Sequence, residues 1–527
     1  MKKSLMMLAA IVCCVMTTAV FTACTNDDDP EPVPSEPENL AEYTILYYGT
    51  GGENLDWLLR FSQFYKADAE AFKKVNVVEQ YKFSTTENLK KQYEPFDDKI
   101  CETFGSKTVR WVVDPSKDYT EQCFNTGNIY GADNADVTCP DSLTNFINWA
   151  AEAYPAKKYI LVIDDHGGGY RPDEELPETV SAATRGILYD DDDSVPGKQD
   201  NYFTVKTFHR AVAAANVRME IIFLYACLMN TLEYQFELQD LCDYVIASTY
   251  VEPGNIGALY ELPVLFSLSD VPIEKKLDEF CKSFVTSWEL FYVENDYPDD
   301  YPIYSDLTVT RTADIPHLGE VLREFTDRLC DTYANGTKEQ RTAINYCTYK
   351  AEKVDKIRPS YDAVKYVKAI INALPEVYGD DFYNRMKEAF NNCILAQYFS
   401  KYLTNHEFMV DYSVLLGAKG AYAYTLWEKD KETGMIFLEQ ERIHYYNGEY
   451  QLYDILRPEV NNGIFEMVPV SDVKNCGSTM ADTYEQLAFD RAVGWSRWLQ
   501  LNKQTPNSFS RAGFEVPLPM PEDDNGD

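Results

Sequence analysis

The sequence predicts an α/β fold in which a mostly parallel sheet of six strands carries helices on both faces. Two observations support this prediction: short apolar runs alternate with amphipathic stretches, and 45% of the 527 residues are hydrophobic, enough to bury a large core. Alternation of this kind is typical of doubly wound sheets, because each crossover helix covers one face of the sheet. The strand candidates are 43–49, 77–83, 108–114, 159–164, 219–226 and 244–249.

Amphipathic stretches with the length of helices separate these runs and then follow one another beyond about residue 260. The helix candidates are 55–74, 141–154, 204–215, 230–240, 274–294, 315–333, 338–349, 360–374, 380–400 and 480–499. A small β-rich patch, "AYAYTLWEK" with "GMIFLEQE", precedes the last of them. We therefore expect a globular α/β domain over residues 42–265 and a mainly helical region with a small β patch over residues 266–510.

The two ends of the chain lack the pattern of a folded domain. Two lysines precede an apolar stretch that ends in "FTAC", which is typical of a signal peptide over residues 1–23. This ending resembles a bacterial lipobox, whose cysteine, here Cys24, becomes lipidated. Residues 24–41 and 511–527 are acidic and Pro-rich, as expected for an extended tether and tail. An acidic run after a lipidated cysteine resembles the signal that sends some Gram-negative lipoproteins to the cell surface, so we expect a surface-exposed outer-membrane lipoprotein.

Charge and cysteine content exclude several other classes of partner and site. Lys and Arg number 48 against 85 Asp and Glu, a net charge of −37 that repels nucleic acid and anionic lipid surfaces. Membrane contact is therefore expected through the lipid alone. Thirteen cysteines contain no C-x-x-C pair, so neither a zinc site nor a disulfide framework is indicated, and most of the ten beyond Cys24 are expected to be buried apolar side chains.

Two of the predicted strands end in reactive side chains. The run "YILVIDDHGGGY" places His166 and Gly167 after one strand, and "MEIIFLYACLMN" places Cys227 after another, directly before a predicted helix. Functional groups of a parallel sheet gather at the carboxyl ends of its strands. A helix N-terminus and a neighbouring imidazolium would both favour the thiolate of Cys227. The amides of Gly167 and Cys227 could then stabilise the oxyanion that forms when a thiolate attacks a peptide carbonyl.

A purely structural interpretation of these motifs stays open at this point. The glycines would form a tight turn, His166 would face solvent in a loop, and Cys227 would fill the end of a strand. Asp164 and Asp165 are further candidates, as groups that orient His166 or as solvated carboxylates.

Taken together, these motifs resemble the clostripain family of caspase-like cysteine peptidases. The strand with His-Gly, the strand with Ala-Cys, "RGILYDDDDS" between them and "EPGNIGALY" after them are similar to that family's catalytic segments, and "YTILYYGTGGENLDWLL" is similar to its opening. The resemblance covers roughly residues 43–265. It implies a caspase-like catalytic domain and a cysteine endopeptidase acting on proteins or peptides, with Cys227 as nucleophile, His166 as general acid/base and the amides of Gly167 and Cys227 as oxyanion hole. It requires no cofactor and no third member of a triad.

The chain departs from the family where the substrate side chain is bound. Members that cut after Arg or Lys commonly carry Asp two residues before the nucleophile and another acid in the pocket loop, where this chain has Tyr225 and Asn255. A buried cation without a carboxylate is strongly disfavoured, so we expect specificity that is not strictly for Arg or Lys. Glu252 would change this expectation if its carboxylate entered the pocket.

Two more features follow from the resemblance. Family members often cut themselves between the catalytic His and Cys after a basic residue, and Lys198 lies on a polar loop suited to such a cut. The run from Asp190 to Asp193 suggests calcium, which the family's namesake uses, but it lacks the ligand spacing of an EF-hand.

A different class of function also fits the sequence. Tyr225 and the altered pocket loop are compatible with a peptidase-like binding lipoprotein of little or no activity. A glycan-binding lipoprotein has only the 39 tyrosines and seven tryptophans in its favour. Retention of both His166 and Cys227 favours the peptidase.

Overall fold

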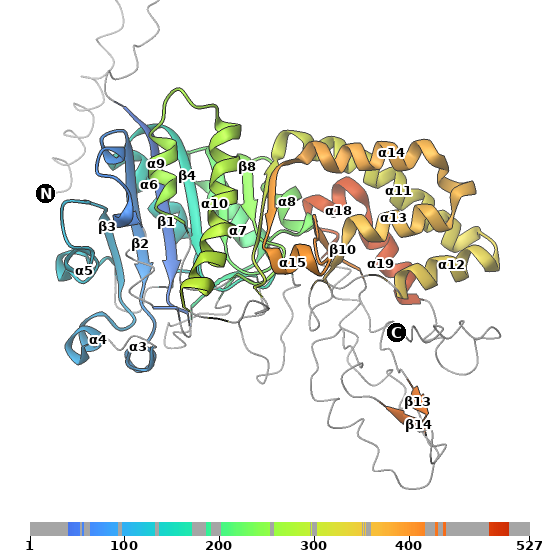
Figure 1. Ribbon diagram of the computed structural model, residues 1–527, viewed down its shortest axis with the longest axis horizontal. Coiled ribbons are helices and arrows are strands. Elements are labelled where there is room, and N and C mark those ends of the chain that lie inside the picture. Colours follow the sequence, from blue (N-terminus) through green and yellow to red (C-terminus); the bar gives the residue numbers. More distant parts are fainter. Residues whose placement is uncertain are drawn as a thin grey trace, which may run out of the picture. The chain divides into compact units, whose positions relative to one another are not determined.

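A sheet of eight strands forms the centre of the described structure (Figure 1). The computed structural model describes residues 40–52, 55–56, 64–92, 97–131, 136–170, 186–190, 202–252, 258–295, 297, 303–349, 351, 354, 360–416, 427–429, 436–438 and 484–504. The strands lie in the order β11-β9-β8-β7-β4-β1-β2-β3. Their bounds are β1 (Ala41–Thr50), β2 (Val75–Lys82), β3 (Thr108–Val112), β4 (Ala156–Asp164), β7 (Met219–Tyr225), β8 (Cys242–Ala247), β9 (Asp306–Arg311) and β11 (Ile394–Phe399).

Most neighbouring strands of this sheet are parallel. The central strands β2, β1, β4, β7 and β8 pair in parallel, whereas β3 pairs antiparallel with β2, β9 with β8 and β11 with β9. The predicted fold class is therefore confirmed. Since β4 and β7 are parallel neighbours, the loops that follow them leave from the same edge of the sheet.

The predicted number of six strands is wrong, because residues beyond 265 add β9 and β11 to one edge of the sheet. Residues 394–399 continue the helical periodicity of the preceding helix, so the sequence predicted one helix over 380–400. They form a strand because they pair with β9, and strand formation depends more on such tertiary pairing than on local preference.

Helices cover both faces of the sheet, because alternate side chains of each strand enter two different cores. Phe223 points into a core with α9 and α10, and Leu224 points into a core with α6, α7 and α8. The helices that adjoin the sheet are α6 (Pro140–Ala153), α7 (Val205–Ala214), α8 (Leu232–Leu238), α9 (Glu261–Phe266) and α10 (Ile273–Glu294).

The helices of the C-terminal region extend the second of these cores. Phe236 of α8 contacts Phe489 of α18, with 5.0 Å between ring centroids, and Figure 1 shows α18 beside α8. The group comprises α11 (Ile315–Asn335), α12 (Lys338–Tyr349), α13 (Ala363–Ala373), α14 (Pro375–Cys393), α18 (Ala488–Val493) and α19 (Trp495–Gln504). The apolar stripes that predicted these helices therefore pack on one another and on the sheet.

Shorter elements complete the described chain. Three small antiparallel pairs are β5 (Ile187–Tyr189) with β6 (Tyr202–Phe203), β10 (Ser360–Asp362) with β12 (Ser413–Leu415), and β13 (Trp427–Lys429) with β14 (Ile436–Leu438). The short helices are α3 (Thr86–Lys91), α4 (Asp98–Phe104), α5 (Tyr119–Cys123) and α15 (Lys401–Asn405), with 3-10 turns at η1 (Phe64–Lys66), η2 (Ala71–Lys73), η3 (Thr126–Asn128) and η5 (Thr312–Asp314).

The helix predicted over residues 55–74 is not continuous in its described part. Only η1 and η2 are helical there, and the Asp68 carboxylate accepts a hydrogen bond from the amide of Glu70 at 3.0 Å between them. Such a local side-chain bond competes with the helix, which explains the interruption.

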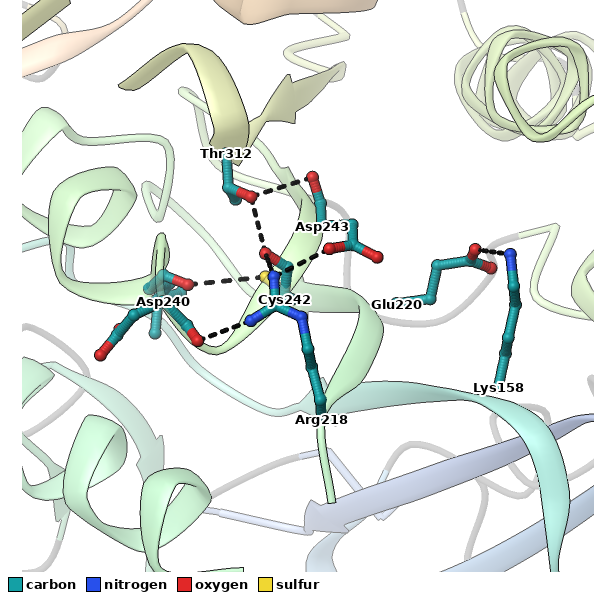
Figure 2. Close-up of polar contacts among 8 residues, drawn as sticks. Lys158, Arg218, Glu220, Asp240, Cys242, Asp243 and Thr312 are labelled. Carbon is teal, nitrogen blue, oxygen red and sulfur yellow. Dashed lines mark hydrogen bonds and ion pairs between the residues drawn. The ribbon is translucent and has the colours of Figure 1, made fainter. Parts of the chain in front are cut away.

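Polar contacts join the strands at the amino ends of β7 and β8 (Figure 2). The Arg218 guanidinium donates to the carbonyl oxygens of Asp240 (2.7 Å) and Cys242 (3.1 Å) and pairs with the Asp243 carboxylate at 2.8 Å. The Thr312 hydroxyl donates to the Cys242 carbonyl at 2.6 Å. The amino ends of β7 and β8 are thus joined by structural contacts. The loops with His166 and Cys227 lie at the other end of the strands, where β4 and β7 have their carboxyl ends.

Candidate active site

His166 and Cys227 follow β4 and β7 at equivalent positions. The last residues of these strands, Asp164 and Tyr225, are partners in the parallel register, and each candidate residue lies two positions further on. Both side chains are partly exposed. The structure therefore brings the two residues to the same edge of the sheet, as the sequence predicted.

Gly167 lies against the backbone of Cys227. A Cβ atom built on Gly167 would be 2.3 Å from the carbonyl oxygen and 3.0 Å from the amide nitrogen of Cys227. Real Cβ atoms do not approach other atoms so closely, so only glycine fits here without movement of the backbone. Two backbone amides, those of Gly167 and Cys227, are thereby gathered at the end of the sheet.

The main chain around His166 is fixed on two sides. Its carbonyl oxygen accepts a hydrogen bond from the amide of Leu188 at 3.1 Å, and the neighbouring Gly168 amide donates to Gly186 at 2.8 Å. A Cβ atom built on Gly52 would lie 3.2 Å from Cδ2 of the imidazole, so the loop after β1 borders the ring. These contacts hold the imidazole on the rim that also carries Cys227.

The two aspartates before His166 are buried and bonded to other parts of the fold. Asp164 accepts a hydrogen bond from the Tyr47 hydroxyl, and Asp165 accepts one from the amide of Tyr189. Asp164 thus joins the end of β4 to β1, and Asp165, the residue after β4, is bonded to β5. Solvated carboxylates, one of the two interpretations from the sequence, are therefore excluded.

Cys227 precedes a helix, as the sequence predicted, but that helix starts two residues later than the predicted start at residue 230. The chain turns at Leu228, whose φ is +64°, and α8 begins only at Leu232, with the Thr231 hydroxyl accepting from the amide of Tyr234 at 3.2 Å. Thr231 is an ordinary N-cap residue, so its type alone could have indicated the later start.

A backbone amide that the sequence did not reveal also contacts the thiol. The amide of Glu252 donates to Cys227 Sγ at 3.3 Å, and Sγ lies 3.6 Å from the carbonyl oxygen of the same residue. Glu252 belongs to the loop after β8, which neighbours β7. An N–H group directed at sulfur stabilises the thiolate more than the thiol.

The carboxyl group of Glu252 lies against the start of β9. Its oxygens are 3.4 Å from the Ser305 hydroxyl and 3.4 Å from the amide of Asp306. Burial and then the neighbouring Asp306 carboxylate hold the pKa of Glu252 well above its usual range. The raised pKa favours the protonated form of this carboxyl group.

Tyr225, the other described residue of the predicted pocket, packs into a core. Its ring stacks on Phe223 with 5.5 Å between centroids and meets Phe284 of α10 edge-on at 5.4 Å. Only 5% of the side chain is exposed. At the position two residues before Cys227, this chain therefore has an aromatic side chain that packs against α10.

The remaining predicted site residues lie mostly outside the described residues. Asn255, Lys198 and Cys24 lie outside the described residues, as do Asp191–Asp193. Asp190 is described and is fully buried in an ion pair with Lys82, with 2.7 Å between carboxylate oxygen and ammonium nitrogen. Across the part of the chain that the structure describes, His, Cys, Asp and Glu form no group able to hold a metal ion.

Cysteine burial separates Cys227 from most other thiols. Seven of the nine described cysteines are buried, as predicted, and only Cys139 and Cys227 are partly exposed. Burial raises the pKa of the Cys330 and Cys347 thiols to about 11 and that of Cys393 to about 12. These buried thiols are poor nucleophiles near neutrality.

Comparison with known proteins decides the family. The model of the clostripain family matches residues 112–498, which is more than half of the chain and includes both His166 and Cys227. This chain belongs to the clostripain family. It is accordingly a cysteine endopeptidase with the caspase-like fold of that family, as the motifs at the ends of β4 and β7 predicted.

Solved structures of related enzymes are similar to this chain. One is a secreted C11 cysteine protease from Bacteroides thetaiotaomicron in complex with an irreversible peptide inhibitor; identity is 15% and the TM-score 0.48, over 86% of this chain and 99% of that chain. Another is an inactive zymogen C11 protease from Parabacteroides distasonis, with 13% identity and a TM-score of 0.45 over 86% and 98%. No curated protein matches the sequence.

Proposed function

We propose that this clostripain-family peptidase hydrolyses peptide bonds with a dyad of Cys227 and His166. The observation that carries the proposal is the contact between Gly167 and the backbone of Cys227 at the edge where β4 and β7 end. It gathers a thiol, an imidazole-bearing loop and two backbone amides on one rim.

The reaction follows from the chemistry of these groups. The thiolate of Cys227 attacks the carbonyl carbon, and the oxyanion accepts hydrogen bonds from the amides of Gly167 and Cys227. His166 gives its proton to the leaving amine, so the C–N bond breaks and a thioester remains. His166 then takes a proton from water, whose oxygen attacks the thioester and releases the carboxylic acid and the thiol. These residues supply every group that the reaction needs, so we propose no cofactor.

The substrate side chain before the cut bond is proposed to be uncharged in preference to Arg or Lys. Support comes from Glu252, whose carboxyl contacts Ser305 and the amide of Asp306 and has a raised pKa, and from Tyr225, which is packed on Phe223. Neither offers a carboxylate to a basic side chain. We keep Asn255 as a further pocket residue.

Attachment to the outer surface of the outer membrane through lipidated Cys24 completes the proposal, and partners are limited to proteins, peptides and this lipid contact. In the described residues no helix combines the length and apolarity that crossing a membrane requires. Lys198 remains the candidate for self-cleavage.

Turnover of a mixture of unmodified peptides tests the proposed dyad. The wild-type chain should cleave peptides, whereas Cys227→Ala and His166→Ala should each lose at least about 10³-fold in kcat/KM. Cys139→Ala, which removes the other partly exposed described thiol, is the matched control and should retain full activity. A wild-type protein as inert as both variants would contradict the proposal and favour a peptide-binding lipoprotein.

A further inference from the structure

The thiol of Cys227 is held by two backbone groups with opposite effects on its ionisation. The amide of Glu252 donates to Sγ at 3.3 Å, whereas the carbonyl oxygen of Glu252 can only accept a bond from the protonated thiol, at 3.6 Å. Once the proton leaves, the amide becomes a charge-assisted donor and the carbonyl becomes repulsive. The position of the Glu252 backbone therefore affects the balance between thiol and thiolate.

Asp306 holds the segment that leads to Glu252. The segment 248–250 follows β8, and Asp306 is the first residue of the antiparallel neighbour β9. One carboxylate oxygen of Asp306 accepts from the Ser248 hydroxyl (2.8 Å) and the Tyr250 amide (2.9 Å), and the other accepts from the Thr249 amide (2.9 Å). Asp306 is fully buried, so these three bonds are shielded from water.

Asp306 also bonds to Glu252 through its own backbone. Its amide lies 3.4 Å from a carboxyl oxygen of Glu252, so the same residue contacts both ends of the segment 248–252. Asp306 thus anchors the segment at residues 248–250 and again at Glu252, whose amide contacts the thiol.

Two carboxyl groups, those of Asp306 and Glu252, lie together in this arrangement. Burial raises the pKa of Asp306, and its three hydrogen-bond donors oppose that rise, whereas nearby Asp306 helps raise the pKa of Glu252. The hydrogen bonds from the segment 248–250 thus favour the ionised form of Asp306, whereas Glu252 is shifted towards its protonated form. From α10, Cys281 adjoins both carboxyl groups. Burial, followed by the carboxyl groups of Asp278, Asp306 and Glu252, raises the pKa of its thiol well above the usual range.

We propose that Asp306 is a positioning residue for the nucleophile, which fixes residues 248–252 so that the amide of Glu252 points at Cys227 Sγ and favours the thiolate. The inference rests on the proposed role of Cys227 and extends it to a strand outside the predicted catalytic segment. It adds a backbone amide to the two groups that the sequence suggested for the same task, the imidazolium and the helix N-terminus.

Alkylation of the full-length protein by iodoacetamide between pH 5 and pH 9, with the modified cysteine located by mass spectrometry, tests this inference without substrate. Asp306→Asn keeps one oxygen for Ser248 and Tyr250 but sets an NH2 group against the Thr249 amide. We expect Cys227 to react about tenfold more slowly at pH 6, corresponding to a shift of its alkylation profile by about one pH unit upward.

Alkylation of Cys227 in Asp306→Asn that is unchanged or faster would contradict the inference. If Asp306 acted only through its negative charge, removing that charge would favour the thiolate and speed the reaction at pH 6. An unchanged or faster reaction would therefore overturn the inference. Asp243→Asn is the control, because it removes the same charge at the opposite edge of the sheet (Figure 2) and should leave the profile unchanged.

A milder variant covers the case in which Asp306→Asn does not fold. Ser248→Ala removes one of the three donors to Asp306 and should slow the reaction at pH 6 about twofold to threefold. An unchanged rate in Ser248→Ala would count against the anchoring role. If wild-type Cys227 were not alkylated at all, the proposed nucleophile would be wrong, which separates that failure from failure of the positioning role.

Discussion

Gly167 and Cys227, sixty residues apart in sequence, are in backbone contact at the edge of the sheet. A Cβ atom on Gly167 would meet the Cys227 carbonyl oxygen at 2.3 Å and its amide nitrogen at 3.0 Å. The contact arises because β4 and β7 are paired in register up to Asp164 and Tyr225. The geometry that a cysteine peptidase needs is therefore set by the sheet and refined by one glycine.

Gly167→Ala should reduce kcat/KM by about 10²-fold or more, because the added methyl group displaces the amides that stabilise the oxyanion. Peptide hydrolysis measures the loss, and the urea midpoint reports on folding. Gly127→Ala is the matched control: its nearest neighbour would be Asn125 Oδ1 at 3.1 Å in an exposed turn, so activity should be unchanged. Full activity in Gly167→Ala would show that no close approach is needed there.

Glu252→Gln should stabilise the protein by an amount that grows with pH. The pKa of Glu252 is raised in the folded state, so above the ordinary value near 4.3 the unfolded chain loses this proton first. Wild-type stability then falls with rising pH up to the raised pKa, by about 1.4 kcal/mol per pH unit for a single group. Glutamine does not titrate and avoids this loss.

Urea unfolding at pH 5 and pH 7 measures this difference, with Glu152→Gln on the exposed side of α6 as the control for the substitution itself. A difference between Glu252→Gln and wild type that is equal at both pH values would contradict a raised pKa for the Glu252 carboxyl.

Cleavage of a diverse peptide mixture should show kcat/KM after Arg and Lys about tenfold or more below that after uncharged residues, because neither Tyr225 nor Glu252 offers a carboxylate. Mass spectrometry of the products gives the cut sites, and Cys227→Ala identifies background cleavage. Products that end mainly in Arg or Lys would refute the interpretation of the pocket.

Cys24→Ala should move the protein from the membrane fraction to the soluble fraction, because a lipidated cysteine is the proposed attachment. Fractionation of cells followed by immunodetection checks this expectation. An unchanged membrane fraction for Cys24→Ala would mean that another segment holds the protein at the membrane.

The sequence predicted the parts of the fold and site that depend on local patterns. Apolar runs indicated all five central strands, and the residues that follow β4 and β7 indicated His166, Gly167 and Cys227. The start of α8 was predicted at residue 230, two residues before its observed start, although Thr231 is a typical N-cap and could have shown it.

Features that depend on distant pairing could not be predicted in the same way. Strand β11 carries a helical pattern and becomes a strand only beside β9. The amide of Glu252 reaches the thiol because Asp306, 54 residues further along the chain, bonds to the loop. No local signal marks an aspartate that accepts three hydrogen bonds from a neighbouring strand end.

The most direct test of the central claim is the identity of the cysteine that an irreversible peptide-based thiol reagent modifies in the native protein. If Cys227 is the nucleophile activated by His166, we expect rapid modification of Cys227, loss of that modification in His166→Ala, and little reaction of the seven buried cysteines among the described residues. Modification of a different cysteine, or equal labelling of Cys227 with and without His166, would contradict it.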